Sequence, residues 1–453
     1  MTLSKTPALT PHGKGHQFVC YADSCSGVKG ALHEKTFAQV NKIVASLEPP
    51  PEFICFPGDE IQGLVSSELE LRNQWRYWFE HEMAWLDRAT ALYQTTGNHT
   101  TYDTMSERVF ADVMSHLPNN GPETQKGLSY FIRKDDLLMV FIHTLWSGLG
   151  GEGFVETDWL EQTLSAHKDA RYKMVFGHHP VFPVNGFAGE YQRHLGSESA
   201  SAFWQCLIRH HVLAYWCSHI LAFDVQVHDG VLHLCTAGAG TAHRMPEESE
   251  YLHCVQASLD TRGLRYQVLD AEAKCREWLE WPPKLPEETL WSEVDPKALP
   301  MFSAQPFLLA FNFEGVAPDA PHKTPQTFLS LVAEGSSVLW IGLQAHRLCV
   351  LISPAPGRSP HLWYGPHLEP EKPFNVQVLI HPGMGPGGIL WRWHEDISWS
   401  SLQAASSWGA ERLSGGDMWH LGYGASPTDR PFLGRDLRIH FHSTNLKPLF
   451  SQK

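Results

Sequence analysis

The sequence predicts an α/β domain followed by an all-β sandwich, and two observations support this prediction. Over residues 18–270, apolar runs typical of buried strands alternate with amphipathic helical patterns, as in sheets whose faces are covered by helices. From about residue 301 the helical patterns stop, and short alternating apolar runs separated by Gly and Pro follow through residues 301–453. Residues 1–17 are expected to be a loose lead-in, and the proline-rich stretch 271–300 is expected to be a linker.

The composition indicates a large, acidic globular protein. The chain has 453 residues, of which 43% are hydrophobic and 19% charged, enough for two domains with sizeable cores. The net charge of −14 argues against nucleic acid or an anionic membrane as the main partner. No stretch is long and apolar enough for a membrane span, and the amino terminus lacks the apolar region of a signal peptide. We therefore expect a cytoplasmic protein whose 9 cysteines are reduced.

The elements of the first domain follow one another in a regular order. A strand at 18–22, a helix around 33–47 and a strand at 53–55 come first, and a long helical pattern over 66–93 leads into Gly97. The remaining expected elements are strands at 130–132 and 137–142, a short helix around Trp159, a strand at 174–177, a helix near 200–210, and strands at 212–217, 222–228, 231–236 and, as a pair, within 252–270.

Polar residues follow the carboxyl ends of several of these strands. The clearest is Asp59, which comes after an apolar run and a turn-forming glycine, Gly58. The others are Asp23, Asn98-His99, His178-His179 and His219. Because open α/β sheets bind ligands at the carboxyl ends of their strands, we expect these loops to form one site. Carboxylate, amide oxygen and imidazole are ligands that suit Mn²⁺, Fe²⁺ or Zn²⁺.

In this order, the strand-end motifs resemble the calcineurin-like metallophosphoesterase superfamily, and its purple acid phosphatase branch most of all. The resemblance covers residues 18–270 and implies a four-layer β-sandwich flanked by helices. The motifs that carry it are Asp23, Gly58-Asp59, Gly97-Asn98-His99, Gly177-His178-His179-Pro180, and His219 followed by Gly238-Ala239-Gly240.

The resemblance implies two neighbouring metal sites that share Asp59. Asp59, Asn98, His178 and His219 would form the first, which we call the imidazole site. Asp23, Asp59 and position 25 would form the second, which we call the thiol site because residue 25 is Cys25. The implied cofactor is one or two divalent ions of Fe, Mn or Zn.

The implied activity is hydrolysis of a phosphate monoester or diester by metal-activated water, with a phosphorylated small molecule as substrate. His99 would protonate the leaving oxygen. His179 is expected to orient the substrate or His178 rather than to bind metal. Asp103 is considered as a residue that orients His99, and His143 as a packing residue.

Three positions depart from the family pattern. Cys25 and Leu221 stand where the family usually has histidine ligands, and Gln62 stands where purple acid phosphatases have tyrosine. We therefore expect one firmly held ion in the imidazole site. Cys25 could bind a second ion as a thiolate, act as a nucleophile, or simply fill the space of a lost ligand.

The carboxyl-terminal domain resembles a laminin-G or concanavalin-like jelly roll. The resemblance rests on residues 311–315, 374–380, 419–424 and 431–439. It implies glycan binding or self-association as possible roles. The tryptophans that could stack on sugars, unless they are core residues, are Trp363, Trp391, Trp393, Trp399, Trp408 and Trp419.

Two alternatives to phosphate ester hydrolysis stay open. One is a single-metal enzyme, using Fe or Mn for redox or lyase chemistry with Cys25 as a participant. The other is a non-catalytic glycan-binding protein. Metal identity and stoichiometry separate the two enzymes, and a protein without bound metal would favour the binding protein.

Overall fold

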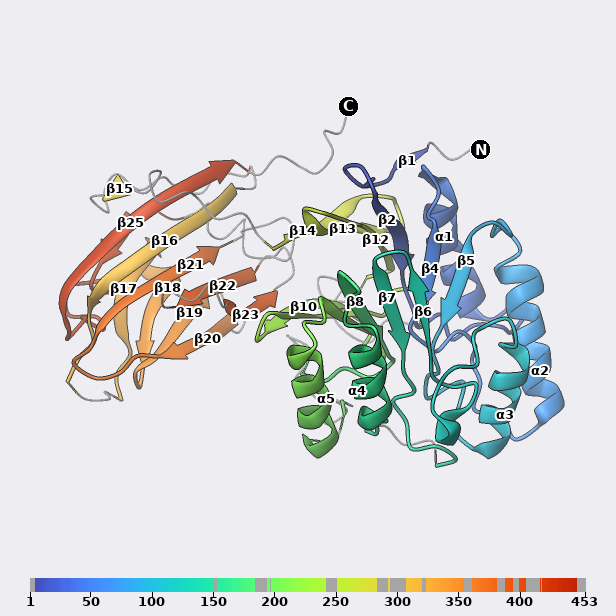
Figure 1. Ribbon diagram of the computed structural model, residues 1–453. Helices are drawn as coiled ribbons and strands as arrows, with labels where there is room; N and C mark the ends of the chain where they lie inside the picture. The colour runs from blue at the N-terminus through green and yellow to red at the C-terminus, as the bar shows by residue number, and fades with distance from the viewer. Residues whose placement is uncertain are drawn as a thin grey trace. The chain divides into compact units, whose positions relative to one another are not determined.

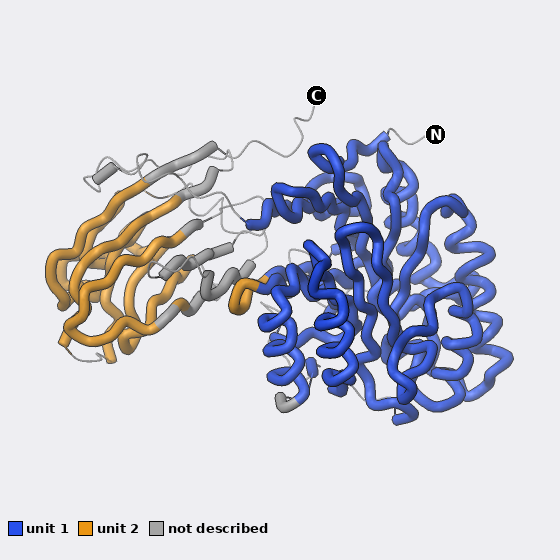
Figure 2. Tube along the Cα trace, in the orientation of Figure 1, with its two compact units in different colours: residues 1–225, 231–282 blue, residues 226–230, 283–453 orange. Residues whose placement is uncertain are grey.

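The computed structural model divides into two compact units, which Figure 2 colours separately. Unit 1 comprises residues 1–225 and 231–282, and unit 2 comprises residues 226–230 and 283–453. The residues that the structure describes are 5–149, 153–183, 194–195, 197–241, 251–282, 292–293, 307–319, 323–353, 361–380, 388–393, 399–404, 416 and 418–445.

Two mixed β-sheets form the centre of unit 1 (Figure 1). The first contains, in spatial order, β14 (Cys275–Trp281), β13 (Gly263–Asp270), β12 (His253–Asp260), β2 (Gly15–Cys20), β4 (Phe53–Phe56) and β5 (Ala91–Gln94). The second contains, in spatial order, residues 223–225 of β10 (Phe223–His228), then β11 (Val231–Thr236), β9 (Ala214–Cys217), β8 (Tyr172–Phe176), β7 (Leu137–Phe141) and β6 (Tyr130–Lys134). Strands β2, β4 and β5 are parallel to one another, and so are β7, β8, β9 and β11. Each sheet therefore has several carboxyl ends at one edge.

Helices pack on one face of each sheet. Side chains of α1 (Leu32–Ser46), α2 (Glu68–Tyr77) and α3 (Thr104–Val113) share a core with Val19 and Ile54 of the first sheet. Side chains of α4 (Thr157–Ala166) and α5 (Ser197–Arg209) share another core with Val140 and Val175 of the second sheet. Unit 1 is thus an α/β sandwich, in agreement with the predicted fold class.

Alternation along the strands explains why the two sheets also pack on each other. In β2, Val19 faces the helices while its neighbour Phe18 faces the opposite sheet. The ring of Phe18 stacks on Phe53 at 5.2 Å and meets the edge of Trp216, from the second sheet, at 5.8 Å. This aromatic layer fixes the register, since a shift of one residue would turn these rings away.

The long helix predicted over 66–93 is wrong in its second half. Helix α2 ends at Tyr77, a π-helical turn covers Trp78–Glu82, and the chain then returns as strand β5. Asp87 closes the connecting turn, because its carboxylate accepts from the Ala89 N–H at 2.9 Å. Parallel pairing of β5 with β4 outweighs the local helical pattern.

The two stretches expected to be irregular also contain strands. In the lead-in, β1 (Thr6–Pro7) pairs with β3 (Leu47–Glu48), and β2 begins at Gly15. The Gln256 side chain bonds both the N–H and the C=O of Leu9, at 2.7 and 3.0 Å. In the stretch predicted to be a linker, β14 pairs antiparallel with β13. In both stretches the backbone N–H and C=O groups form hydrogen bonds with a neighbouring strand. The polar, proline-rich sequence does not predict this pairing.

The regular structure described in unit 2 consists of strands. One group of neighbouring strands is β15 (Ser292–Glu293), β25 (Arg435–Asn445), β16 (Phe307–Val316), β21 (Pro373–Ile380), β22 (Gly388–Trp393) and β23 (Trp399–Ala404). The other is β20 (His361–His367), β19 (Arg347–Ile352), β18 (Ser336–Gln344), β17 (Gln326–Ala333) and β24 (Met418–Leu421). Phe311 of the first group and Phe328 and Trp419 of the second belong to one core. The jelly-roll resemblance stays a prediction.

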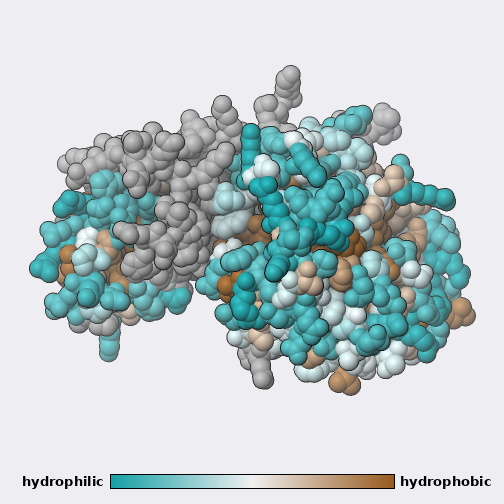
Figure 3. Space-filling view, viewed as in Figure 1, coloured by the Kyte–Doolittle hydropathy of each residue, from teal (hydrophilic) through white to brown (hydrophobic). Residues whose placement is uncertain are grey.

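The face of the molecule in Figure 3 is largely hydrophilic, with small apolar areas scattered over it. Large exposed apolar side chains in the described residues include Leu64, Leu69, Trp146 and Leu149. Among the described helices, none combines the length and the apolar character that a bilayer crossing requires.

Candidate metal centre

The structure brings the predicted site residues together at the carboxyl ends of the strands. Asp23 follows β2, Asp59 follows β4, Asn98 and His99 follow β5, His178 and His179 follow β8, and His219 follows β9. Three groups have ligand atoms within 4.8 Å of one another: Asp23, Asp59 and His178; His178, His179 and His219; and Cys25, Asp59 and His99. Asn98 joins them through a contact with His178.

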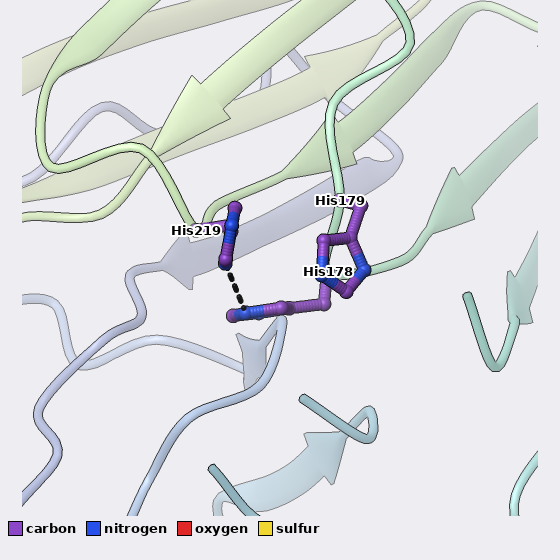
Figure 4. Close-up of side chains that lie close together, drawn as sticks. All are labelled: His178, His179 and His219. Atoms are coloured by element: carbon purple, nitrogen blue, oxygen red, sulfur yellow. Dashed lines mark hydrogen bonds between the residues drawn. The ribbon is translucent and has the colours of Figure 1, made fainter. Parts of the chain in front are cut away.

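His178 lies at the centre of the imidazole site. Its Nε2 is 3.0 Å from Asn98 Oδ1, 3.1 Å from His219 Nδ1 and 3.1 Å from Asp59 Oδ2. Figure 4 shows the His178 and His219 rings joined by this contact, with His179 beside them. On the other side of the His178 ring, Nδ1 is 3.0 Å from the carbonyl oxygen of Pro57, which can only accept. In the neutral ring, Nδ1 therefore carries the proton and Nε2 presents its lone pair to the other ligands.

This convergence of lone pairs calls for a positive charge. Burial lowers the pKa of His178, but the carboxylate of Asp59 outweighs burial and raises that pKa to about 9. Burial raises the pKa of Asp59, while His178 and His99 bring it below its ordinary value. A proton on Nε2 can satisfy one acceptor at a time, whereas a divalent cation can bind every ligand atom at once. The residues fit Fe²⁺, Mn²⁺ or Zn²⁺.

Second contacts hold the ligands in place. Ser218 Oγ donates to the Pro57 carbonyl at 2.6 Å and lies 2.9 Å from His178 Nδ1. The His219 backbone N–H donates to Asp23 Oδ2 at 2.9 Å. Hydrogen bonds of this kind fix the tautomer and orientation of a metal ligand. Ser218 was missed by the sequence reasoning, and its only signal is its position directly before His219.

The backbone at the strand ends adopts unusual conformations. Asp23, Asp59 and His219 have φ values of 63°, 57° and 68°, in the left-handed region that residues other than glycine seldom occupy. Gly97 allows a close approach, because a Cβ there would lie 2.2 Å from Asp59 Oδ1. Strain of this kind persists where the surrounding contacts enforce it, and it is typical of functional sites.

His99 is oriented by the backbone rather than by a carboxylate. Its Nδ1 lies 2.7 Å from the carbonyl oxygen of Gln62, so Nδ1–H donates and Nε2 is the atom that can exchange a proton. The His99 N–H donates to Asp59 Oδ1 at 2.8 Å. Asp103, considered as the orienting residue, instead caps α3 by accepting from the Ser106 N–H at 2.7 Å.

The thiol site has a different electrostatic character. Cys25 is 4% exposed, and its backbone N–H donates to the Asp59 carbonyl at 2.8 Å. Burial, and then the carboxylates of Asp59 and Asp23, raise the pKa of the Cys25 thiol well above its ordinary value. Burial also raises the pKa of Asp23, to about 6. Without a cation the thiol is therefore protonated at neutral pH, which weighs against Cys25 as a nucleophile.

His179 and His143 lie beside the predicted metal ligands. His179 Nδ1 is 2.8 Å from Thr144 Oγ1, and its ring centre is 4.5 Å from that of His219. His143 Nδ1 is 2.7 Å from Thr96 Oγ1, and burial lowers the pKa of His143 to about 3. A neutral, buried His143 is what the packing interpretation expects.

Comparisons with known proteins give likenesses in structure only. No protein-family model matches the sequence, and no curated protein matches it. Among solved structures, the chain is similar to a purple acid phosphatase from yellow lupin (Lupinus luteus) seeds, with 11% identity, coverage of 60% of this chain and 54% of that one, and a TM-score of 0.42. A dimetal phosphatase from Danio rerio shows 14% identity over 56% of this chain and 95% of that one, with a TM-score of 0.40.

A third similar structure is GAP50, the anchor in the inner membrane complex of Plasmodium. It shows 16% identity over 59% of this chain and 88% of that one, with a TM-score of 0.41. That protein is described as an anchor, whereas the other two are described as phosphatases. Likenesses at these identities and scores assign no activity to this chain, so its function is argued from the site.

Proposed function

We propose that this chain is a metal-dependent hydrolase of phosphate monoesters or diesters of small molecules. The observation that carries the proposal is the convergence of Asn98, His219 and Asp59 on one nitrogen of His178, with His99 bonded to the same Asp59. This convergence supports a cation site next to a residue that can exchange protons, which is the combination that phosphate ester hydrolysis needs.

The imidazole site would hold the first ion. A bound divalent ion neutralises charge on the phosphoryl group and lowers the pKa of water. The chain fixes the geometry around it: Pro57 and Ser218 orient His178, and the His99 backbone N–H holds one carboxylate oxygen of Asp59. The thiol site would hold a second ion only if that ion displaces the Cys25 thiol proton.

His99 would supply the proton for the leaving group. The bond from phosphorus to the leaving oxygen breaks as the bond from water to phosphorus forms, and the leaving oxygen takes a proton from His99 Nε2. The attacking water loses a proton to solvent, and His99 takes one up again before the next turnover. Its anchored Nδ1 keeps the ring in place throughout.

The other hypotheses receive less support. Without a cation, burial and the carboxylates of Asp59 and Asp23 raise the pKa of the Cys25 thiol, which gives no support to nucleophilic chemistry of the metal-free chain. Trp419 is 4% exposed and belongs to the core of unit 2, so it is not available to stack on a sugar. The side chains of Trp363, Trp391, Trp393, Trp399 and Trp408 lie outside the described residues. Glycan binding and self-association through a jelly-roll domain therefore stay proposals to be tested.

The test compares metal content and hydrolysis of a generic aryl phosphate in the wild type, His178→Ala and His211→Ala. His211 is an exposed histidine outside the site, so it controls for the loss of an imidazole. We expect one to two ions per wild-type chain at the imidazole and thiol sites, and loss of these ions and of hydrolysis in His178→Ala only. Hydrolysis that is unchanged in His178→Ala would overturn the proposal.

A further inference from the structure

Another set of metal-binding side chains lies between helices α4 and α5 of unit 1. It consists of Glu161, Cys206 and His210, whose ligand atoms lie within 4.8 Å of one another. None of them belongs to the imidazole or the thiol site. We propose that these residues form a separate site for a thiophilic divalent cation such as Zn²⁺. The proposal does not depend on the proposed function.

Helical spacing brings two of the ligands onto one face. Cys206 lies in α5, and His210 follows the end of α5 four residues later. The His210 N–H donates to the Cys206 carbonyl at 3.2 Å, so the helical turn continues through His210. Side chains four residues apart on such a turn are neighbours. The thiol and the imidazole can therefore bind the same ion.

Helix α4 supplies the third ligand in a fixed orientation. Glu161 Oε1 lies 2.5 Å from His210 Nε2, while Glu161 Oε2 lies 2.5 Å from the guanidinium of Arg209. The two carboxylate oxygens thus have different partners. Arg209 holds Oε2 and keeps Oε1 turned towards His210. Outer contacts of this kind orient metal-binding carboxylates.

The chemistry and burial of the set suit zinc. Thiolate sulfur, imidazole nitrogen and carboxylate oxygen are the common protein ligands of Zn²⁺, and three of them leave a fourth position for water. Cys206 is fully buried, whereas the side chain of His210 is 15% exposed and that of Glu161 37% exposed. One side of the set is therefore covered by the core, and the other is open for the ion to enter.

Hydrogen bonds join the side chains that the ion would bind. The Cys206 thiol bonds to Glu161, and burial followed by this bond raises the pKa of the thiol to about 12. Binding would release the proton from Cys206 and any proton on His210 Nε2, and it would link α4 to α5 through the ion. The competing interpretation is an ion pair between Glu161 and Arg209 with a buried cysteine beside it.

Cobalt is the probe that separates the two interpretations, because a thiolate bound to Co²⁺ gives a charge-transfer absorption band. The full chain would carry Cys25→Ser, so that the thiol site contributes no sulfur. We expect a band that saturates at one Co²⁺ per chain and is bleached by Zn²⁺. Adding Cys206→Ser should abolish it, and adding His210→Ala or Glu161→Gln should weaken Co²⁺ binding by at least about tenfold.

Matched controls keep the outcome clear. Gln205→Ala changes an exposed residue of the same helix and should leave the band intact. His178→Ala should also leave it intact, so loss of the candidate metal centre and loss of this site are distinguishable. Since Cys206→Ser alters a buried position, Glu161→Gln and His210→Ala test the site at more exposed ones. Absence of a band in the Cys25→Ser protein, or a band that survives Cys206→Ser, would overturn the proposal.

Discussion

The imidazole site and the thiol site lie at the same sheet edge and share Asp59, but the electrostatic environments of their side chains differ. In the imidazole site, neutral and anionic ligand atoms converge on His178 Nε2, and a cation relieves their repulsion. In the thiol site, burial and two carboxylates keep Cys25 protonated. The backbone is similarly unusual in both, with positive φ at Asp23, Cys25, Asp59 and His219. The difference between the two sites therefore lies in the side chains that the strand ends present and not in the backbone.

The largest effect is expected at Asp59, because it belongs to both sites. Asp59→Asn should remove the charge that attracts either ion. In a Cys206→Ser background, which removes the proposed site between α4 and α5, we expect no retained metal and a fall in hydrolysis beyond about 10⁴-fold, the upper range of a single proton-transfer residue. Elemental analysis and aryl phosphate kinetics measure the two effects. A variant that keeps one ion would show that the sites do not share this ligand.

His99→Gln should separate chemistry from metal binding. Proton transfer from a positioned side chain contributes about 10²–10⁴-fold, so kcat should fall by that amount with the metal content unchanged. The loss should shrink for esters whose leaving groups are acidic, because they need no proton. An equal loss for all leaving groups would contradict the role of His99.

Ser218→Ala tests whether the Ser218 hydroxyl helps to orient His178 for metal binding. The hydroxyl lies 2.9 Å from His178 Nδ1 but would not touch the ion, so its loss should weaken metal affinity by about 10–100-fold. Hydrolysis at saturating metal should recover. Ser199→Ala, a partly buried serine of α5, is a suitable control. Unchanged affinity in Ser218→Ala would mean that Pro57 alone orients His178.

Cys25→Ser tests whether the thiol site holds an ion at all. If Cys25 only fills space, metal content should not change and hydrolysis should change less than about tenfold, since a buried polar replacement costs stability more than chemistry. If Cys25 binds a second ion, that ion alone should be lost. The double variant Cys25→His with Leu221→His then asks whether imidazoles restore two ions per chain.

The smallest effect on metal binding and hydrolysis is expected from substituting His143. This residue lies beside the site, and its lowered pKa leaves it neutral near pH 7. Burial lowers its folded pKa from 6.5 to about 3, so the unfolded chain binds the extra proton between these values. Stability should therefore fall as the pH drops below 6.5, by at most about 1.4 kcal/mol per pH unit. His143→Asn should flatten this part of the pH dependence in urea unfolding. Parallel curves for the two proteins would contradict it.

Local pattern predicted most of unit 1. The runs that became β4, β7 and β8 are short, apolar and followed by polar turns, so both the strands and the residues after them could be identified. Helix α1 was found from its amphipathic spacing. The helix predicted around Asp87 is wrong because the apolar residues there have helical spacing, whereas the strand that follows is stabilised by pairing with β4.

The geometry of the site depends on information that the sequence does not display. Ser218 and the carbonyl oxygen of Pro57 both contact His178. They do so because β4 and β9, which belong to different sheets, end close to each other. Likewise, the sequence of β14 is typical of a polar linker, and it forms a strand because it pairs with the edge strand β13. The protonated state of Cys25 depends on burial and on two carboxylates from other strand ends.

The two oxygens of Asp59 have separate partners, and this has a consequence for folding. One oxygen accepts from the His99 N–H and the other faces His178, so both have a partner from the protein itself. The Asp59 carboxylate is therefore not left as an unpaired buried charge when no ion is bound. Folding of these strand ends would not have to wait for metal, and an ion could load into a site that is already formed.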